Sequence, residues 1–240
     1  MLDFSRANPL KQEIEIKGAV FDCVRRVARD RPRLPSASPS TINNHEFMCK
    51  AMEEVSKYET QMVYWLSEIR LLADPELDSK GSIMDGSSFD AFCRTLIYNR
   101  GPRFDYSSPN RQADDSLAIS FGYWYLWKKF QMARRWKDGP PAWAFHEMLL
   151  RKLSEPFTEA EDRVQYARNF FVSHLGRIGW VPFRTRAGDQ VCVMQGMRIP
   201  LILRPRGDRW EVIGACYVHG LMDGELWDLD GLRWVFMCFV

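Results

Sequence analysis

Short apolar runs separated by turns mark the last part of the chain. Each run is rich in Val, Ile, Leu, Trp or Tyr, and Gly, Pro or Asp residues stand between the runs. Apolar runs bounded by turn residues are typical of β-strands, and connections of a few residues favour antiparallel hairpins. The pattern therefore predicts a small, mostly antiparallel sheet or barrel with strands at Gln190–Met194, Ile199–Leu203, Trp210–Val218 and Trp234–Val240.

A different pattern near the start predicts one more strand. Residues Glu13–Ile16 alternate charged and apolar side chains, which is the period of a half-exposed strand. This strand can extend to Val27 and join the C-terminal sheet, which would tie the two ends of the chain together. The next segment, Arg31–Thr41, is rich in Pro and Ser without periodicity, so we expect a loop that is either a lid or disordered.

Apolar side chains at helical spacing fill the middle of the chain. The pattern predicts a long helix that Asn44 caps and Asp74-Pro75 ends, because a residue before proline leaves the helical region. A second stretch, 113–136, carries aromatic side chains almost all round a helix. A helix that is apolar on every side is buried or lines a cavity.

Three shorter helices complete this predicted helical region. Ser87 or Ser88 is expected to cap the first, and Thr158 with Glu161 forms the capping-box pattern that predicts the start of the last. These helices are predicted at 89–97, Ala142–Leu153 and Glu159–Phe171.

The order of these elements indicates an α+β fold with a single domain over 1–240. Its parts are an N-terminal strand region (1–30), a helical region (42–175) and a β region (176–240). The chain has 240 residues, of which 46% are apolar and 27% are charged. This composition is that of a globular protein able to bury a sizeable core.

The net charge and the cysteines indicate which binding partners and which cellular compartment to expect. The formal net charge of +2 gives no reason to expect nucleic acid, and basic residues do not follow the aromatic stretch. The six cysteines contain no Cys-x-x-Cys pair, which favours reduced thiols. No apolar run reaches the length of a membrane span, and Met1–Gln12 lacks the layout of a secretory signal. We therefore expect a cytoplasmic protein.

The chain lacks the short motifs of common enzyme classes. It has no phosphate-binding, dinucleotide-binding, zinc-protease or serine-hydrolase pattern. His146-Glu147 has no second histidine four residues on, and the chain contains only four histidines. We expect neither a metal site nor a cofactor.

Several segments near the C-terminus resemble a known family. Residues 191–196 (VCVMQG), 200–204 (PLILR) and 213–225 (IGACYVHGLMDGE) are similar to the region that follows the HET domain in fungal heterokaryon-incompatibility proteins. Glycine-rich residues at 176–189 and the segment Glu13–Asp22 extend the resemblance. No segment resembles the HET domain itself. The resemblance implies a fold and a fungal origin, without implying cell-death signalling.

Segment 217–225 has the highest density of side chains that could take part in catalysis, among them Tyr217 and His219. A carboxylate such as Asp223 beside His219 could set the tautomer and pKa of the imidazole. The alternative is that His219 and Asp223 hydrogen-bond the backbone of a tight turn. This alternative is favoured, because the resemblance implies that the large family members carry the same residues.

Arg204 is a further candidate in the same region. Its guanidinium could bind an anionic group of a substrate. A salt bridge to Asp208 or Asp223 is the favoured alternative.

The aromatic content suggests a site for an apolar molecule. Tryptophan, tyrosine and phenylalanine make up 13% of the chain, with a dense block at 121–130. Most must lie in the core, yet a helix of this kind can also enclose a mostly hydrophobic ligand pocket. Five aromatic residues would shape such a pocket: Phe121, Trp124, Tyr125, Trp127 and Trp180.

Two functions of different classes follow. The first is a cofactor-independent cyclase of fungal natural-product biosynthesis that folds an apolar terpenoid or polyketide, with His219, Tyr217 or Arg204 donating to a carbonyl. It would be similar in type to the norbornene-forming Diels–Alderase of the sordaricin pathway. The second is a non-catalytic interaction or regulatory module of an incompatibility protein. The enzyme is favoured because a HET domain, the usual output of the module, is missing from the sequence.

Overall fold

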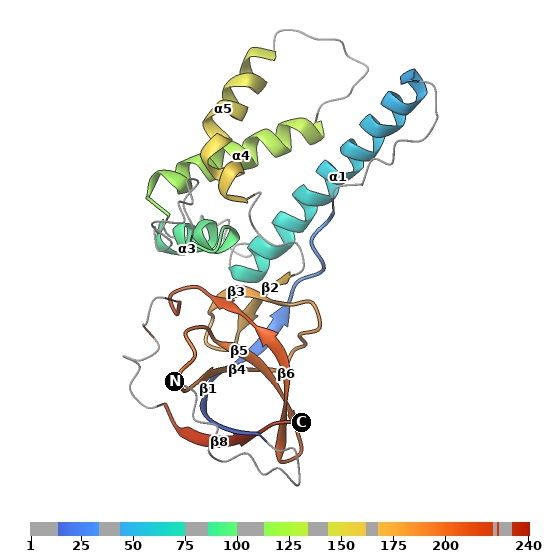
Figure 1. Cartoon of the computed structure of the whole chain (residues 1–240). Coiled ribbons are helices and arrows are strands. Elements are labelled where there is room, and N and C mark those ends of the chain that lie inside the picture. The colour runs from blue at the N-terminus through green and yellow to red at the C-terminus, as the bar shows by residue number, and fades with distance from the viewer. Residues whose placement is uncertain are drawn as a thin grey trace. The chain divides into compact units, whose positions relative to one another are not determined.

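The computed structural model divides the chain into two compact units (Figure 1). It describes residues 14–33, 44–74, 86–99, 113–133, 144–161, 168–222, 225 and 232–240. The barrel unit comprises Met1–Asp30, Leu72–Pro75 and Ala167–Val240, and the helical unit comprises Arg31–Leu71 and Glu76–Tyr166. The single domain expected over 1–240 stays a prediction. Most of the loop expected at Arg31–Thr41 lies outside the described residues.

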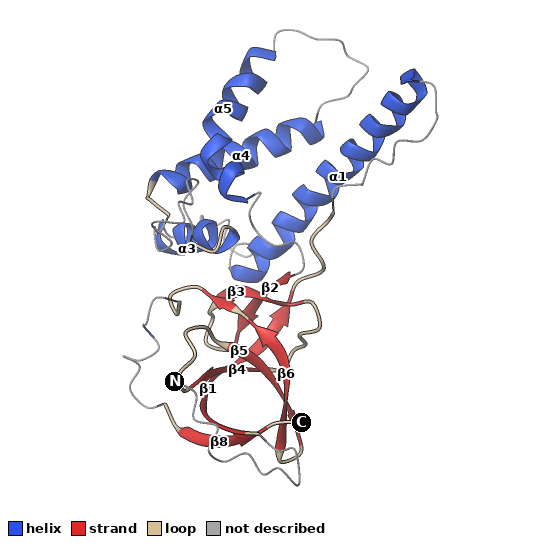
Figure 2. Ribbon diagram, viewed as in Figure 1, coloured by secondary structure: helices blue, strands red, loops and turns tan. Residues whose placement is uncertain are grey.

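Helices and strands segregate between the two units, which confirms the α+β fold (Figure 2). The described helices are α1 (Asn44–Ala73), α3 (Gly86–Leu96), α4 (Ser116–Ala133) and α5 (Ala144–Glu161). The long helix α1 begins at Asn44 and ends just before Asp74-Pro75, as predicted. Helix α4 confirms the aromatic helix within 113–136.

The predicted start of a last helix at Thr158 is wrong. Helix α5 runs without a break from Ala144 to Glu161 and contains Pro156 in its interior. The Thr158 hydroxyl donates to the Ser154 carbonyl one turn earlier, at 3.0 Å, so it lies inside a helix. The residues expected to continue the helix, 168–171, belong to a strand instead.

That strand is β2 (Arg168–Ser173), and its burial explains the error. All of its side chains except that of Arg168 are buried, so neither a period of 2 nor a period of 3.6 is visible in the sequence. The remaining strands are β1 (Glu15–Val27), β3 (Ile178–Pro182), β4 (Gln190–Met194), β5 (Leu201–Arg206), β6 (Arg209–Ala215), β7 (Tyr217–Val218) and β8 (Trp234–Cys238).

The strands pair in an order that closes on itself. The order is β6-β5-β4-β1-β2-β3-β7, with every neighbouring pair antiparallel. Strands β6 and β7 are consecutive in the chain and are separated by Cys216 alone. The two ends of the order are therefore covalently joined, and the sheet curves round as a barrel (Figure 2). The predicted strand Trp210–Val218 is this pair, divided where it changes partner from β5 to β3.

The early strand β1 is central to the barrel, as expected. Its first half pairs with β4 and β8, and its second half pairs with β2. The register shifts between Val20 and Asp22 and again between Val24 and Arg26. Such bulges bend a strand, which allows one strand to take part in both halves of the barrel.

Strands β4 and β5 bury both faces and so separate two apolar cores. On β4, Val191 and Val193 belong to one core, and Cys192 and Met194 belong to the other. The first core also holds Ala19, Val24, Phe171, Val181, Ile202, Cys216, Val218 and Leu221, and the second also holds Leu201, Leu203 and Met237. Burial on both faces explains why these strands read as continuous apolar runs.

Candidate functional site

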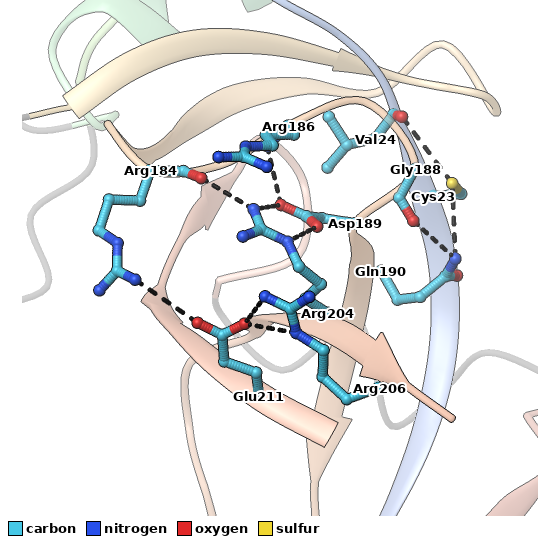
Figure 3. Close-up of polar contacts among 10 residues, drawn as sticks. All are labelled: Cys23, Val24, Arg184, Arg186, Gly188, Asp189, Gln190, Arg204, Arg206 and Glu211. Carbon is cyan, nitrogen blue, oxygen red and sulfur yellow. Dashed lines mark hydrogen bonds and ion pairs between the residues drawn. The ribbon is translucent and has the colours of Figure 1, made fainter. Parts of the chain in front are cut away.

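Arg204 lies on β5 and is held by a buried carboxylate (Figure 3). Its Nε and Nη2 atoms donate to the two carboxylate oxygens of Asp189, at 2.8 Å and 2.9 Å. The side chains of Arg204 and Asp189 are 13% and 3% exposed. This paired geometry raises the pKa of Arg204, because the carboxylate stabilises the charged guanidinium. A salt bridge to Asp208 or Asp223 was expected, and the partner found is Asp189. Asp223 lies outside the described residues.

The backbone fixes Asp189 in place. The Asp189 carbonyl accepts from the Val24 N–H at 2.8 Å, and the Gly188 N–H donates to the Val24 carbonyl at 2.9 Å. The Arg186 N–H donates to the Asp189 carboxylate at 2.8 Å, and Arg204 Nη2 also donates to the Arg184 carbonyl at 2.9 Å. The ion pair therefore connects β5 to the β3–β4 connection and to β1.

A second, more exposed ion pair lies close by (Figure 3). Arg206 donates from Nε and Nη2 to one oxygen of Glu211, at 2.9 Å and 2.7 Å, and Arg184 Nη2 lies 3.5 Å from the other oxygen. The bonds from Arg206 are the main reason that the pKa of Glu211 is lowered. Together the two pairs form a polar network on the outside of β5 and β6.

Tyr217, His219 and Trp180 come together on the ladder between β3 and β7. The Tyr217 hydroxyl lies 3.3 Å from His219 Nδ1. Trp180 and Tyr217 are directly paired across the two strands, so their side chains leave the same face. The His219 N–H donates to the Ile178 carbonyl at 2.9 Å, which extends the pairing of β3 with β7 by one backbone bond. The tight-turn role expected of the His219 side chain stays a prediction. Trp180 is buried and meets Phe170 edge-on at 5.7 Å.

The aromatic side chains of α4 lie in the helical unit. Phe121 is buried at the centre of a ring cluster, with Phe157 at 5.1 Å and Tyr125 at 6.0 Å. Phe89, Phe92 and Trp124 complete this cluster at 5.7 Å, 6.0 Å and 5.8 Å from Phe121. Phe121 and Trp124 are therefore part of the helical core, whereas Tyr125 and Trp127 are only half-buried.

A charged pair lies beside the two tryptophans of α4. Lys128 Nζ donates to Glu59 Oε1 at 3.0 Å and lies 4.7 Å and 5.9 Å from the ring centroids of Trp127 and Trp124. An ammonium near an aromatic face is attracted by the ring quadrupole. Sequence reasoning missed Glu59 and Lys128. The only available signal was that both residues interrupt otherwise apolar helix faces.

Four of the cysteines show no sign of a reactive thiolate. Burial raises the pKa of Cys192 to about 12 and also raises those of Cys93 and Cys216. For Cys23, burial and then the neighbouring Asp22 carboxylate raise the pKa. Because a thiol needs a lowered pKa to act as a nucleophile at neutral pH, these cysteines are unsuited to that role.

The described part of the chain holds neither a cluster of metal ligands nor a membrane-spanning helix. No group of three or more His, Cys, Asp or Glu side chains there could hold a metal ion. Each helix described above falls short of the length and apolar character that a membrane crossing requires.

Part of the chain is similar to a known domain family. Residues 137–237 match the model of the Het-6 beta-barrel domain, which is found in fungal HET-6-like proteins. No curated protein and no solved structure matches the chain. No relationship to a Diels–Alderase is shown. The matched range begins after β1, although the barrel requires β1 to connect β2 with β4.

Proposed function

We propose, from the premise that the chain contains a Het-6 beta-barrel domain, that it binds an apolar terpenoid or polyketide and promotes its cyclisation without a cofactor. The observation that supports this proposal is the aromatic helix α4. Half-buried Tyr125 and Trp127 adjoin the ring cluster of Phe121 and Trp124, and the indole N–H groups of both tryptophans are buried without an acceptor among the described residues. Apolar walls with a few polar groups are the usual lining of a small-molecule site.

The proposed reaction needs only folding of the substrate and polarisation of a carbonyl. A cycloaddition forms two carbon–carbon single bonds from two π bonds, and no proton, electron or leaving group is exchanged. Holding the reacting ends together removes several kcal/mol of the barrier. A hydrogen bond to the carbonyl of the electron-poor partner lowers the barrier further.

The barrel unit, considered by itself, holds its own candidate donors to a substrate carbonyl. Tyr217 and His219 contact each other, so the imidazole can accept from the phenol or orient it. We propose Tyr217 or His219 as the donor, with Trp180 beside them binding substrate. Arg204 is a weaker third candidate, because two of its nitrogen atoms already donate to Asp189.

Product formation tests the proposal. The purified chain is incubated with an extract of fungal terpenoid and polyketide intermediates, and the mixture is analysed for isomers of unchanged mass. We expect a new cyclic isomer, and Tyr217→Phe or His219→Ala should reduce its rate by about 100-fold if that residue is the donor. An unchanged rate in both variants and in Arg204→Met would remove all three residues from the donor role. A lack of any new isomer would contradict the cyclase.

Exposed apolar side chains favour a second candidate, an interaction module. Ile119 and Leu126 on α4, and Met148, Leu149 and Leu153 on α5, are all exposed. Exposed apolar patches often mark protein-binding surfaces. If the chain is an interaction module, the double variant Leu126→Lys/Met148→Lys should abolish capture of a protein partner by the tagged chain. A cyclase should keep its rate in the same variant.

A further inference from the structure

Three buried polar atoms around one ion pair of the helical unit, that of Lys128 and Glu59, lack hydrogen-bond partners among the described residues. They are Glu59 Oε2, Trp124 Nε1 and Trp127 Nε1. Trp124 as a whole is only 2% exposed, and the side chains of Glu59 and Lys128 are each 12% exposed. Water therefore has little access to these atoms from the surface.

The three atoms belong to one neighbourhood. Trp124 and Trp127 are three residues apart on α4, which places them on the same side of the helix. Both rings lie within 6 Å of Lys128 Nζ, at 5.9 Å and 4.7 Å, and the same ammonium bonds the other oxygen of Glu59 at 3.0 Å. Two indole rings thus lie beside the Lys128–Glu59 pair, and neither of their N–H groups bonds the second carboxylate oxygen of Glu59.

Leaving such groups unpaired is costly. A buried donor or acceptor that loses its partner destabilises a protein by about 1–3 kcal/mol, and more when the group is charged. Native structures contain few such groups, because almost all buried polar atoms bond a protein group or an ordered water. The cluster therefore calls for an occupant that both donates to Glu59 and accepts from an indole.

The charges select the chemical class of that occupant. A carboxylate or phosphate would accept from the indoles but would be repelled by Glu59 Oε2. An ammonium would donate to Glu59 but would be repelled by Lys128 and could not accept from the indoles. A hydroxyl group donates one hydrogen bond and accepts others without a net charge.

We infer that Glu59, Trp124, Trp127 and Lys128 form the polar end of a ligand site that takes the hydroxyl group of an apolar alcohol. The inference rests on the proposed function for the apolar body of the ligand and adds its recognition group. The hydroxyl donates to Glu59 Oε2 and accepts from Trp127 or Trp124 Nε1. The aromatic residues of α4 bind the hydrocarbon part.

Four probes that share a farnesyl-type hydrocarbon chain but differ in their polar group test whether the site prefers a hydroxyl. Binding of farnesol, farnesoic acid, farnesylamine and farnesene to the full chain is measured by calorimetry at neutral pH. We expect farnesol to bind at least tenfold more tightly than each of the other three probes. In the protein labelled with ¹⁵N-tryptophan, farnesol should also shift the indole N–H signals that disappear in Trp127→Phe or Trp124→Phe.

Variants test the residues. Trp127→Phe keeps an aromatic ring but removes the N–H with the five-membered part of the indole, and Glu59→Gln removes the charge of the carboxylate. Each should weaken farnesol binding by about three- to tenfold, as expected for one hydrogen bond. Trp65→Phe, the same change at a buried tryptophan of α1, should leave the affinity unchanged. Melting temperatures show whether each variant is folded.

The outcomes separate this inference from the proposed function. Equal binding of farnesene and farnesol would overturn the hydroxyl site while supporting an apolar ligand. Tighter binding of the acid or the amine would overturn the charge argument. If none of the four probes binds, both the inference and the ligand-binding part of the proposed function are wrong.

Discussion

At the residue scale, the Arg204–Asp189 pair shows how a candidate binding residue acquires a structural role. The two residues are 15 positions apart and meet because β4 pairs with β5 in one register. A salt bridge of Arg204 was predicted, but Asp189 was not among the partners considered. Asp208 is nearer to Arg204 in the sequence, and only the strand register shows that Asp189 is the partner.

Removing one member of this pair should be strongly destabilising. We expect Arg204→Met to lower the free energy of unfolding by about 3 kcal/mol, because it leaves the buried Asp189 carboxylate without its partner. The matched change Arg206→Met removes a pair whose arginine is 54% exposed, and it should cost less than about 1 kcal/mol. Urea denaturation measures both values. Equal losses would contradict the conclusion that the Arg204–Asp189 pair is buried and the Arg206–Glu211 pair is exposed.

The buried thiols predict a loss of stability at high pH. The pKa of Cys192 is raised from 9.0 to about 12 by burial, so the folded chain keeps this proton when the unfolded chain has lost it. Stability is therefore complete below pH 9 and falls as the pH rises towards 12, by about 1.4 kcal/mol per pH unit for one thiol. The slope of unfolding free energy against pH should become shallower in Cys192→Ala. An unchanged slope would show that ionisation of Cys192 does not cause the loss of stability at high pH.

At the element scale, helix α5 continues across Pro156 because a side chain of α4 bonds the backbone on both sides of the proline. Proline removes one helical hydrogen bond and disturbs the preceding turn. The Ser120 hydroxyl of α4 bridges the disturbed turn, donating to the Leu153 carbonyl at 3.1 Å and accepting from the Phe157 N–H at 3.1 Å. A proline that normally ends a helix is therefore tolerated because another helix supplies the missing partner.

Loss of that hydroxyl should be costly. We expect Ser120→Ala to lower the free energy of unfolding by about 2 kcal/mol, because the Phe157 N–H and the Leu153 carbonyl both lose a partner. Ser154→Ala is the control: its buried hydroxyl donates only to the Arg151 carbonyl within α5, so we expect a smaller loss of about 1 kcal/mol. If the two variants unfold at the same urea concentration, Ser120 does not have the bridging role.

The same elements show what the sequence could predict. Helix α1, the aromatic helix α4 and strands β4 and β8 follow from local pattern and turn residues. Strand β2 and the continuity of α5 could not be predicted, because Phe170 and Phe171 are buried on both faces and Ser120 lies far away in the chain. The Tyr217–His219 contact could be predicted from the sequence, because the two residues are only two positions apart. The Glu59–Lys128 pair, 69 positions apart, was not.

At the scale of the whole molecule, closure of the barrel depends on the contact between β3 and β7. A side chain on Gly179 would place its Cβ 2.0 Å from the Tyr217 carbonyl oxygen and 2.8 Å from the Phe171 ring. Only glycine allows the two strands to approach this closely. The same contact positions Trp180 beside Tyr217, so closure of the barrel and the geometry of the proposed donors are linked.

A substitution at this glycine should disrupt closure. We expect Gly179→Ala to lower the free energy of unfolding by about 3 kcal/mol or more, since backbone must move to admit the methyl group. Gly122→Ala provides the control, because nothing lies within 4 Å of that Cβ on helix α4 and alanine is the better helix former. Calorimetric melting should show a gain for Gly122→Ala. A similarly small effect of Gly179→Ala would contradict the close approach of β3 and β7.

The central claim is that the chain binds an apolar small molecule, and native mass spectrometry tests it most directly. The full chain is mixed with an extract of fungal terpenoid and polyketide intermediates, separated from unbound material and weighed intact. We expect a retained compound at one copy per chain, and less retention by Trp127→Phe than by Trp65→Phe. A chain recovered without any bound compound would contradict the claim and favour the interaction module.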